Sequence, residues 1–85
     1  MRFKYFPETN SFFVKFTEEK SIDSIEIADG VIADLDENEN IVGIEFYSVG
    51  DKINLNEFVF EQFPIKNINF IDFPKERELV NSQTV

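Results

Sequence analysis

Hydrophobic and polar residues alternate along the first half of the chain with a period of two, which is typical of β-strands. The alternation is clear in "RFKYF" and in "FFVKF", which are separated by the turn-rich "PETNS". It returns in "IDSIEI", "VIADL" and "IVGIEFY", again with short polar or glycine-containing breaks. The sequence therefore predicts an antiparallel β-meander. Its five strands are expected at residues 2–6, 11–17, 22–27, 31–36 and 41–47.

The last two of these strands form the best-defined hairpin. If the hairpin closes between Asp36 and Ile41, Asp34 lies opposite Gly43 and the apolar residues of both strands share one face. That face, together with matching positions on the first two strands, forms the predicted core. The side chains expected to be buried are Phe3, Tyr5, Phe12, Val14, Phe16, Leu35, Val42, Ile44 and Phe46.

After Gly50 the hydrophobic period changes from two to that of a helix. The stretch "NLNEFVFEQFP" has apolar residues at helical spacing, and Asn54 followed by Glu57 resembles a capping box. Pro64 ends the pattern. We therefore predict a short helix over residues 55–63, which makes the fold class mainly β (α+β).

The chain is expected to form a single domain in which residues 1–63 hold the β-meander and the helix. Residues 64–85 are a C-terminal extension. Within it, "IKNINFIDF" is extended in character, with apolar residues on both sides. It is interpreted either as a sixth strand or as a segment that a partner buries. The polar end, "PKERELVNSQTV", is expected to be a flexible tail.

Composition and charge narrow the classes of function. The 85 residues include neither cysteine nor histidine, so disulfides, thiolate chemistry and histidine bases are excluded. Seventeen acidic residues against eight basic ones give a net charge of −9. Such a surface repels nucleic acids and anionic membranes and favours a basic protein partner. The N-terminus does not resemble a signal peptide and no apolar run is long enough to span a membrane, so a cytoplasmic location is expected.

The stretch "DLDENENIVGIE", from Asp34 to Glu45, has oxygen-bearing side chains at nearly the spacing of a helix-flanked calcium loop. The position that normally requires glycine is Glu39, and both flanks alternate like strands. In the predicted register, Glu45 lies opposite Ile32, beyond easy reach of the turn carboxylates. We interpret the stretch as an acidic hairpin turn and expect no metal, no cofactor and no catalytic residue.

The hairpin also carries a family resemblance. The stretches "YFPETNSFFVKF" and "GVIADLDENENIVGIEF" are similar to a family of small bacterial proteins called domain of unknown function 2283. This chain differs from the usual family pattern at Phe6, where relatives have Asp, and at Glu39, where they have Gly. The resemblance implies a β-meander with a short helix and supplies no catalytic residues. Because some relatives are encoded beside small toxin-like nuclease domains, it also implies an antitoxin-like role.

Three interpretations of function follow. The first is a non-enzymatic interaction module that binds a basic protein, such as a small toxin-like nuclease. The second is a structural homo-oligomer, because Phe13, Ile41, Tyr47 and Phe60 are expected on the face opposite the core. An enzyme or a calcium-binding protein is the interpretation that the sequence favours least. The candidate interface residues are Phe13, Tyr47, Phe60, Ile68, Phe70, Ile71 and Phe73.

Overall fold

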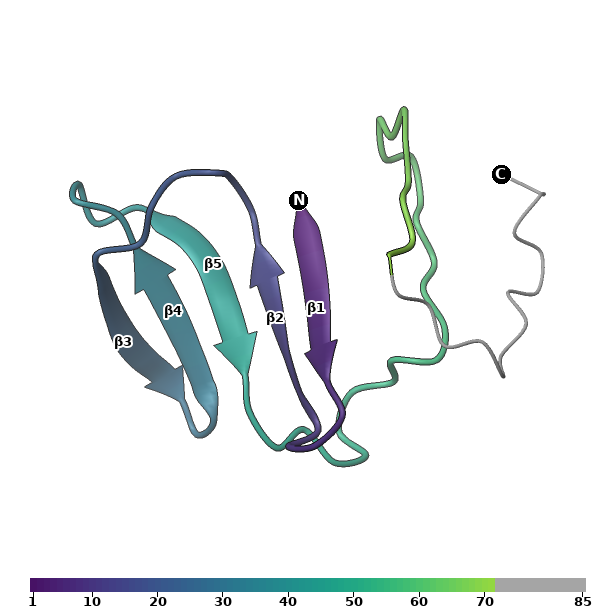
Figure 1. Ribbon diagram of the computed structural model, residues 1–85, viewed down its shortest axis with the longest axis horizontal. Helices are drawn as coiled ribbons and strands as arrows, with labels where there is room; N and C mark the ends of the chain where they lie inside the picture. The colour runs from purple at the N-terminus through teal and green to yellow at the C-terminus, as the bar shows by residue number, and fades with distance from the viewer. Residues whose placement is uncertain (72–85) are drawn as a thin grey trace.

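A computed structural model describes residues 1–71, which contain one open antiparallel sheet of five strands (Figure 1). The strands are β1 (Arg2–Phe6), β2 (Ser11–Lys15), β3 (Asp23–Ala28), β4 (Val31–Leu35) and β5 (Ile41–Phe46). Each begins and ends within two residues of its predicted position. Alternation with a period of two was therefore sufficient to locate every strand.

The strand order differs from the predicted meander. It runs β1-β2-β5-β4-β3, so β5 lies between β2 and β4, and β3 forms the far edge. The connection between β2 and β3 passes over the end of the sheet (Figure 1). The meander order was wrong because alternation locates strands but says nothing about which neighbour each one pairs with. The central position goes to the strand "IVGIEF", while the acidic "DSIEIA" stays at the solvent-exposed edge.

The register of the β4–β5 hairpin confirms the prediction for most of its length. Asp34 lies opposite Gly43, and Ile32 lies opposite Glu45. The register then shifts, and Leu35 pairs with Ile41. A second irregularity interrupts the pairing of β3 with β4 between Glu26 and Ala28. Shifts of this kind bend a strand locally and are common at sheet edges.

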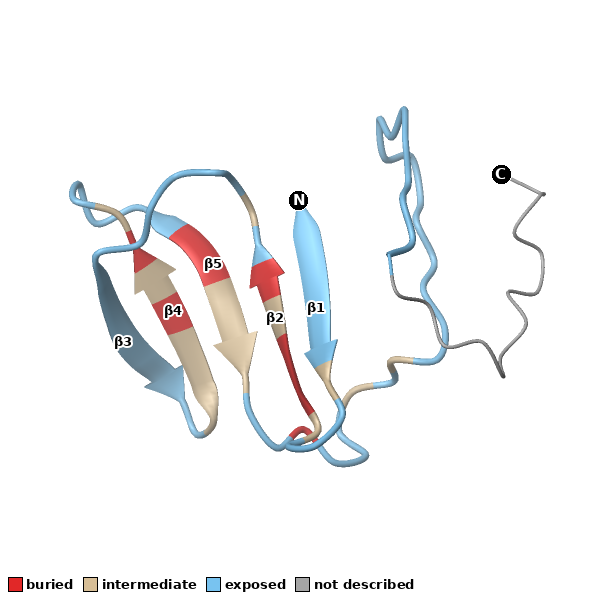
Figure 2. Cartoon of the chain, in the orientation of Figure 1, coloured by how far each residue is buried: buried red, intermediate tan, exposed pale blue. Residues whose placement is uncertain are grey.

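The core lies on one face of the sheet, over its central strands (Figure 2). The rings of Phe12 and Phe46 stack with their centroids 4.6 Å apart. After β5 the chain contributes Val49, Ile53 and Leu55 to the same cluster. The buried apolar side chains are Phe12, Val14, Ala33, Leu35, Val42 and Val49.

Ser11 joins the start of β2 to this returning chain. Its side chain is almost fully buried, donates a hydrogen bond to the Thr9 carbonyl and accepts one from the Ser48 amide. The backbone N–H of Val49 also donates to the carbonyl of Asn10, at 2.9 Å. These bonds fix the segment that places Val49 in the core.

The predicted core is confirmed in the centre of the sheet and wrong at its edge. Of the nine predicted residues, Phe12, Val14, Leu35 and Val42 are buried, and Phe16, Ile44 and Phe46 are partly buried. Phe3 and Tyr5 are 48% and 47% exposed. Both lie on β1, an edge strand that pairs only with β2, so no second strand covers their other side.

The predicted helix over residues 55–63 is also wrong, since no part of residues 1–71 is helical. The capping interaction exists locally, because the Asn54 side chain accepts a hydrogen bond from the Asn56 amide at 3.0 Å. However, a helix of nine residues is marginal in water unless its apolar side packs against something. Phe58, Val59 and Phe60 are all exposed, and aromatic and β-branched residues are moderate helix formers at best.

The sixth strand predicted within residues 65–73 is not formed over residues 65–71, which have no regular structure. The remaining two positions and the predicted flexible tail lie outside the described residues.

Candidate functional site

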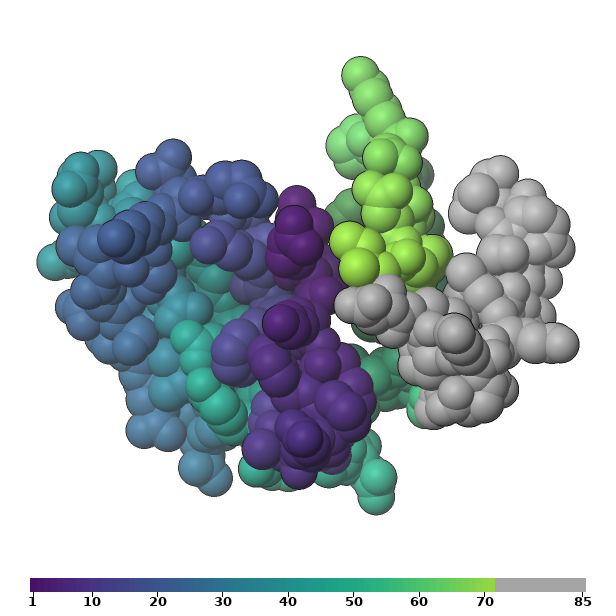
Figure 3. All heavy atoms as spheres, viewed as in Figure 1, coloured from purple at the N-terminus to yellow at the C-terminus, as the bar shows by residue number. Residues whose placement is uncertain are grey.

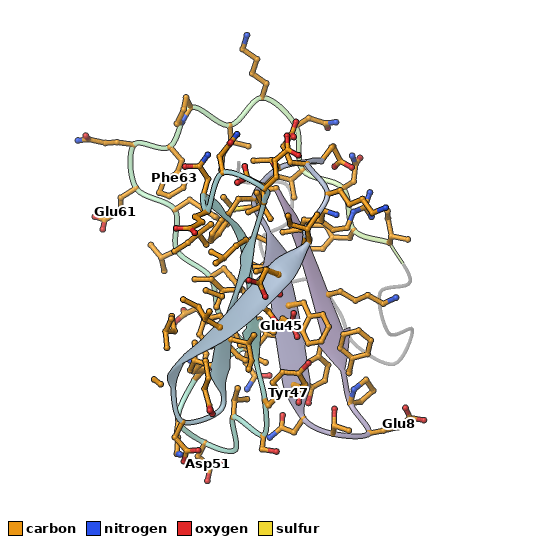
Figure 4. All side chains as sticks on the ribbon, turned by 90° about the vertical axis from the view of Figure 1, so that its left-hand side faces the viewer. Glu8, Glu45, Tyr47, Asp51, Glu61 and Phe63 are labelled. Atoms are coloured by element: carbon orange, nitrogen blue, oxygen red, sulfur yellow. The ribbon has the colours of Figure 1, made fainter. Side chains whose placement is uncertain are left out.

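Three polar side chains gather on the sheet face opposite the core. β4 contributes Asp34, β5 contributes Glu45, and Tyr47 follows directly after β5. The Tyr47 hydroxyl donates a hydrogen bond to Glu45 Oε1 at 2.5 Å, and Asp34 shares a side-chain hydrogen bond with the same glutamate. Figure 4 shows Glu45 and Tyr47 close together on the sheet. We call these three residues the acidic cluster.

The surroundings of the acidic cluster shift two pKa values. Partial burial, the hydrogen bond to Glu45 and the charge of Glu45 together raise the pKa of Asp34 to about 6, although Lys15 acts in the opposite direction. The hydrogen bond to Glu45, with some burial and the carboxylate charges, raises the pKa of Tyr47 to about 12. The protonated form of Asp34 is therefore favoured up to about pH 6.

Gly43 makes the close packing around Asp34 sterically feasible. A Cβ atom at this position would lie 2.9 Å from the backbone oxygen of Val14 and 3.5 Å from Asp34 Oδ2. A shallow hollow of about 120 Å³ beside it is lined by Lys15, Asp34 and Gly43, among others. The glycine thus lets β2 and β5 approach closely at the point where the aspartate side chain lies.

The chemistry available to the acidic cluster is limited. Two carboxyl groups and a phenol can share and exchange a proton, but within residues 1–71 no three acidic side chains converge as metal ligands. The hollow beside the cluster is also far smaller than a typical ligand pocket of roughly 300–1,000 Å³. We therefore interpret the cluster as a pH-sensitive element of the sheet.

The sequence prediction missed this cluster, because it separated Glu45 from the carboxylates of the hairpin. The signal was present in the predicted register. Asp34 opposite Gly43 and Glu45 opposite Ile32 make the two acids diagonal neighbours on one sheet face. Diagonal neighbours in an antiparallel pair are within reach of long side chains.

The stretch from Asp34 to Glu45, whose spacing resembles that of a calcium loop, contains a turn that is held by its own hydrogen bonds. The Asp36 carboxylate accepts hydrogen bonds from the amides of Asn38 and Asn40, at 2.8 and 2.9 Å. These bonds, led by that from Asn40, lower the pKa of Asp36. Glu39 occupies the left-handed region with φ of 65°, the conformation for which glycine is normally preferred. Asp34 is turned toward Glu45 instead, so the alternating acids do not surround a common point.

The predicted interface residues fall into two separate groups. Phe13 and Tyr47 contact each other on the face opposite the core, with ring centroids 5.6 Å apart. Phe60 does not join them, because it packs against Phe58 and Phe63 in the chain that follows the sheet. Ile68, Phe70 and Ile71 are exposed in that same chain, and Phe73 lies outside the described residues.

Residues 58–71, here called the apolar segment, expose an unusual number of large side chains. They extend from the β1 side of the sheet (Figure 1). Figure 4 shows Phe63 and Glu61 on this outlying loop. Eight large apolar residues in the segment are 41–75% exposed. They are Phe58, Val59, Phe60, Phe63, Ile65, Ile68, Phe70 and Ile71.

The fold and the site define a class: a mainly β domain with one open antiparallel sheet and an acidic cluster on the face opposite its core. The chain belongs to the family described as "Protein of unknown function (DUF2283)", whose model matches residues 2–49. This confirms the resemblance that the hairpin motif indicated. No curated protein and no solved structure matches the chain.

The family match includes all five strands and ends before the apolar segment. Within residues 1–71, no helix is long and apolar enough to cross a membrane.

Proposed function

We propose that this protein is a non-enzymatic, acidic interaction module that binds a basic protein partner. The observation that carries the proposal is the apolar segment, in which eight large apolar side chains are exposed within fourteen residues. Monomeric proteins rarely expose large contiguous apolar surfaces, and such surfaces usually mark interfaces.

The energetics favour a partner for this segment. Fully burying a single Val, Ile or Phe side chain contributes about 1.5–3 kcal/mol relative to leaving it exposed. The rings of Phe58, Phe60 and Phe63 already contact one another in sequence, with centroids 6.4 and 5.5 Å apart. A row of partly preassembled aromatic side chains needs less ordering when it binds, and aromatic residues are enriched among the strongest contributors to interfaces.

The charge of the molecule selects the kind of partner. With a net charge of −9, the protein attracts basic surfaces and associates faster with them at low salt. A small toxin-like nuclease is a partner of this kind, because its basic residues would otherwise bind RNA. The antitoxin-like role is therefore the specific form of the proposal.

The test begins with affinity purification of the tagged protein from its native cell, followed by mass spectrometry and purification of the partner. Calorimetric titration then compares the wild type with the triple variant Phe58→Ser, Phe63→Ser and Ile68→Ser. We expect binding to weaken by at least about a hundredfold, since several buried apolar contacts are lost.

Ile41→Ser is the matched control, because Ile41 is 49% exposed at the hairpin and lies outside the apolar segment. Its affinity should equal that of the wild type. If the triple variant remains folded and binds the purified partner as tightly as the wild type, the proposal is wrong.

A homo-oligomer remains the alternative, since a second copy could also cover the apolar segment. Sedimentation of the isolated protein distinguishes the two. A monomer at micromolar concentration supports the interaction module, whereas a dimer that the same triple variant dissociates supports the oligomer.

A further inference from the structure

The negative charge is concentrated in one half of the sheet. Residues 21–50 include eight Asp and Glu residues and no Lys or Arg, and these residues form β3, β4 and β5. Residues 1–20, which form β1 and β2, include four basic and three acidic residues. A charged partner therefore encounters a molecule with one strongly acidic side and one nearly neutral side.

β3 is the outer strand of the acidic half. All six of its residues are exposed, and no other strand of residues 1–71 pairs with its outer edge. Its two faces differ, because Glu26 lies on the face of the acidic cluster and Ile25 lies on the core face opposite Ala33. Ile25 and Ile27 are 49% and 51% exposed. The edge thus offers backbone hydrogen-bonding groups between a face that carries Glu26 and a face that carries Ile25, with Asp23 at the start of the latter.

We propose that the outer edge of β3 binds an extended segment of a partner protein in which Lys or Arg residues alternate with apolar residues. This inference rests on the proposed function, because it assigns a surface and a sequence chemistry to the basic partner. The segment adds to the sheet as a further strand. Backbone hydrogen bonds hold it in place, its apolar side chains cover Ile25 and Ile27, and its cations face Glu26.

The charges on β3 also act against other occupants. A second copy pairing through the same edge would bring carboxylates next to carboxylates, and like charges oppose such pairing. In the isolated chain, the Asp23 carboxylate accepts a hydrogen bond from the Ser24 amide at 2.8 Å. This bond and the irregularity between Glu26 and Ala28 reduce indiscriminate pairing at the edge. A basic strand would be attracted by the same carboxylates, so the charges that repel a second copy would favour this partner instead.

The opposite edge does not offer the same surface. β1 carries Arg2 and Lys4, and its Phe3 packs against Phe58 of the apolar segment, with ring centroids 5.9 Å apart. The segment's atoms lie next to those of β1 (Figure 3). Because β3 and the apolar segment lie at opposite ends of the sheet (Figure 1), variants can test the two surfaces separately.

The test uses the full chain, labelled with ¹⁵N, and a capped synthetic peptide of about eight alternating Lys and Val residues, roughly the length of a strand. We expect saturable binding with the largest amide shifts along β3 and slower hydrogen exchange of its amides. Glu26→Lys should weaken binding about fivefold or more, because it replaces an attractive cross-strand pair with a repulsive one. Glu61→Lys, the same charge change on the apolar segment, should leave the affinity within twofold of the wild type.

Two further peptides separate strand addition from simple charge attraction. A peptide with Glu in place of Lys should not bind, and one with every backbone amide N-methylated should bind much more weakly, because it cannot donate the backbone hydrogen bonds. Equal binding of the N-methylated peptide would overturn the inference. So would shifts that are largest outside β3, or an equal effect of Glu61→Lys. If the apolar-segment variant abolishes partner binding while the peptide leaves β3 unchanged, the proposed function stands and this inference fails.

Discussion

At the scale of single residues, the acidic cluster shows how one glycine and the pairing register of two strands affect the pKa of an aspartate. Gly43 has no side chain, so β2 and β5 approach closely and Asp34 packs opposite it. Partial burial, together with the hydrogen bond to the diagonal neighbour Glu45 and the charge of Glu45, then raises the pKa of Asp34 to about 6. Two residues further along the chain, the pKa of Asp36 is lowered instead, because its carboxylate accepts amide hydrogen bonds.

The raised pKa of Asp34 predicts a specific pH dependence of stability. Between its ordinary value of 3.8 and about 6, the folded protein keeps a proton that the unfolded chain loses. The contribution is complete below pH ~3.8 and is lost as the pH rises through about 6. We therefore expect Asp34→Asn to raise the melting temperature at pH ~7.5, with a gain that shrinks toward pH ~4.

Asp36→Asn is the control with the opposite sign. Its pKa is lowered in the folded protein, so its contribution is present at neutral pH and is lost on acidification. This variant should melt below the wild type at neutral pH. Thermal unfolding followed by circular dichroism across pH measures both variants. An Asp34→Asn protein with the same pH profile as the wild type would contradict the assignment.

Gly43→Ala tests the close approach of the strands. The added methyl group would lie 2.9 Å from the backbone oxygen of Val14, which cannot move aside cheaply. We expect a loss of roughly 1–3 kcal/mol in unfolding free energy, the usual cost of overpacking. Urea denaturation measures it, with the exposed Ser24→Ala on the edge strand β3 as the control. A variant as stable as the control would argue against this geometry.

At the scale of elements, burial follows the position of each strand in the sheet. The central strands β2, β4 and β5 hold the buried residues, whereas the edge strands β1 and β3 hold none (Figure 2). The alternating pattern in β1 and β3 is as regular as in the centre. Alternation therefore indicates which side of a strand faces the core, but the number of neighbouring strands decides how deeply that side is buried.

This difference predicts unequal costs for similar truncations. Leu35 on β4 is 8% exposed, and Ile25 on β3 is 49% exposed. Leu35→Ala should lower the unfolding free energy by roughly 2–5 kcal/mol, as expected for a buried leucine. Ile25→Ala should cost about 1 kcal/mol or less, since its side chain is already half in solvent. Chemical denaturation of the two variants would contradict this arrangement if their losses were equal.

At the scale of the whole molecule, the apolar and the acidic surfaces lie at opposite ends of the sheet. The apolar segment extends from the β1 side, and the acidic half ends at β3 (Figure 1). Within residues 1–71, the last side chains packed against the core cluster are those of Ile53 and Leu55, so the apolar segment is not part of that cluster. The sheet and the apolar segment are therefore separable parts.

Truncation after Pro64 tests that separation. We expect the shortened protein to keep its sheet, because Ile65, Ile68 and Ile71 are 41–71% exposed and do not belong to the core cluster. Binding to the purified native partner should weaken sharply or disappear. Amide spectra and thermal unfolding report the fold, and calorimetry reports the binding. An unfolded truncation would place residues 65–85 in the core, and unchanged affinity would place the interface elsewhere on the molecule.

The sequence by itself determined the positions of the five strands, the register around Asp34 and Gly43, and the membership of the family. These features are local or nearly so, because alternation and a short hairpin involve residues close together in the chain. The central position of β5, the exposure of β1 and the absence of the helix were decided only by the tertiary structure. Each depends on which distant segment packs against which, and packing, rather than local propensity, stabilises short helices and sheets. The acidic cluster falls between the two cases. Its register was readable from the hairpin, but the pKa of Asp34 depends on burial and on Lys15 of β2, which only the folded sheet brings together.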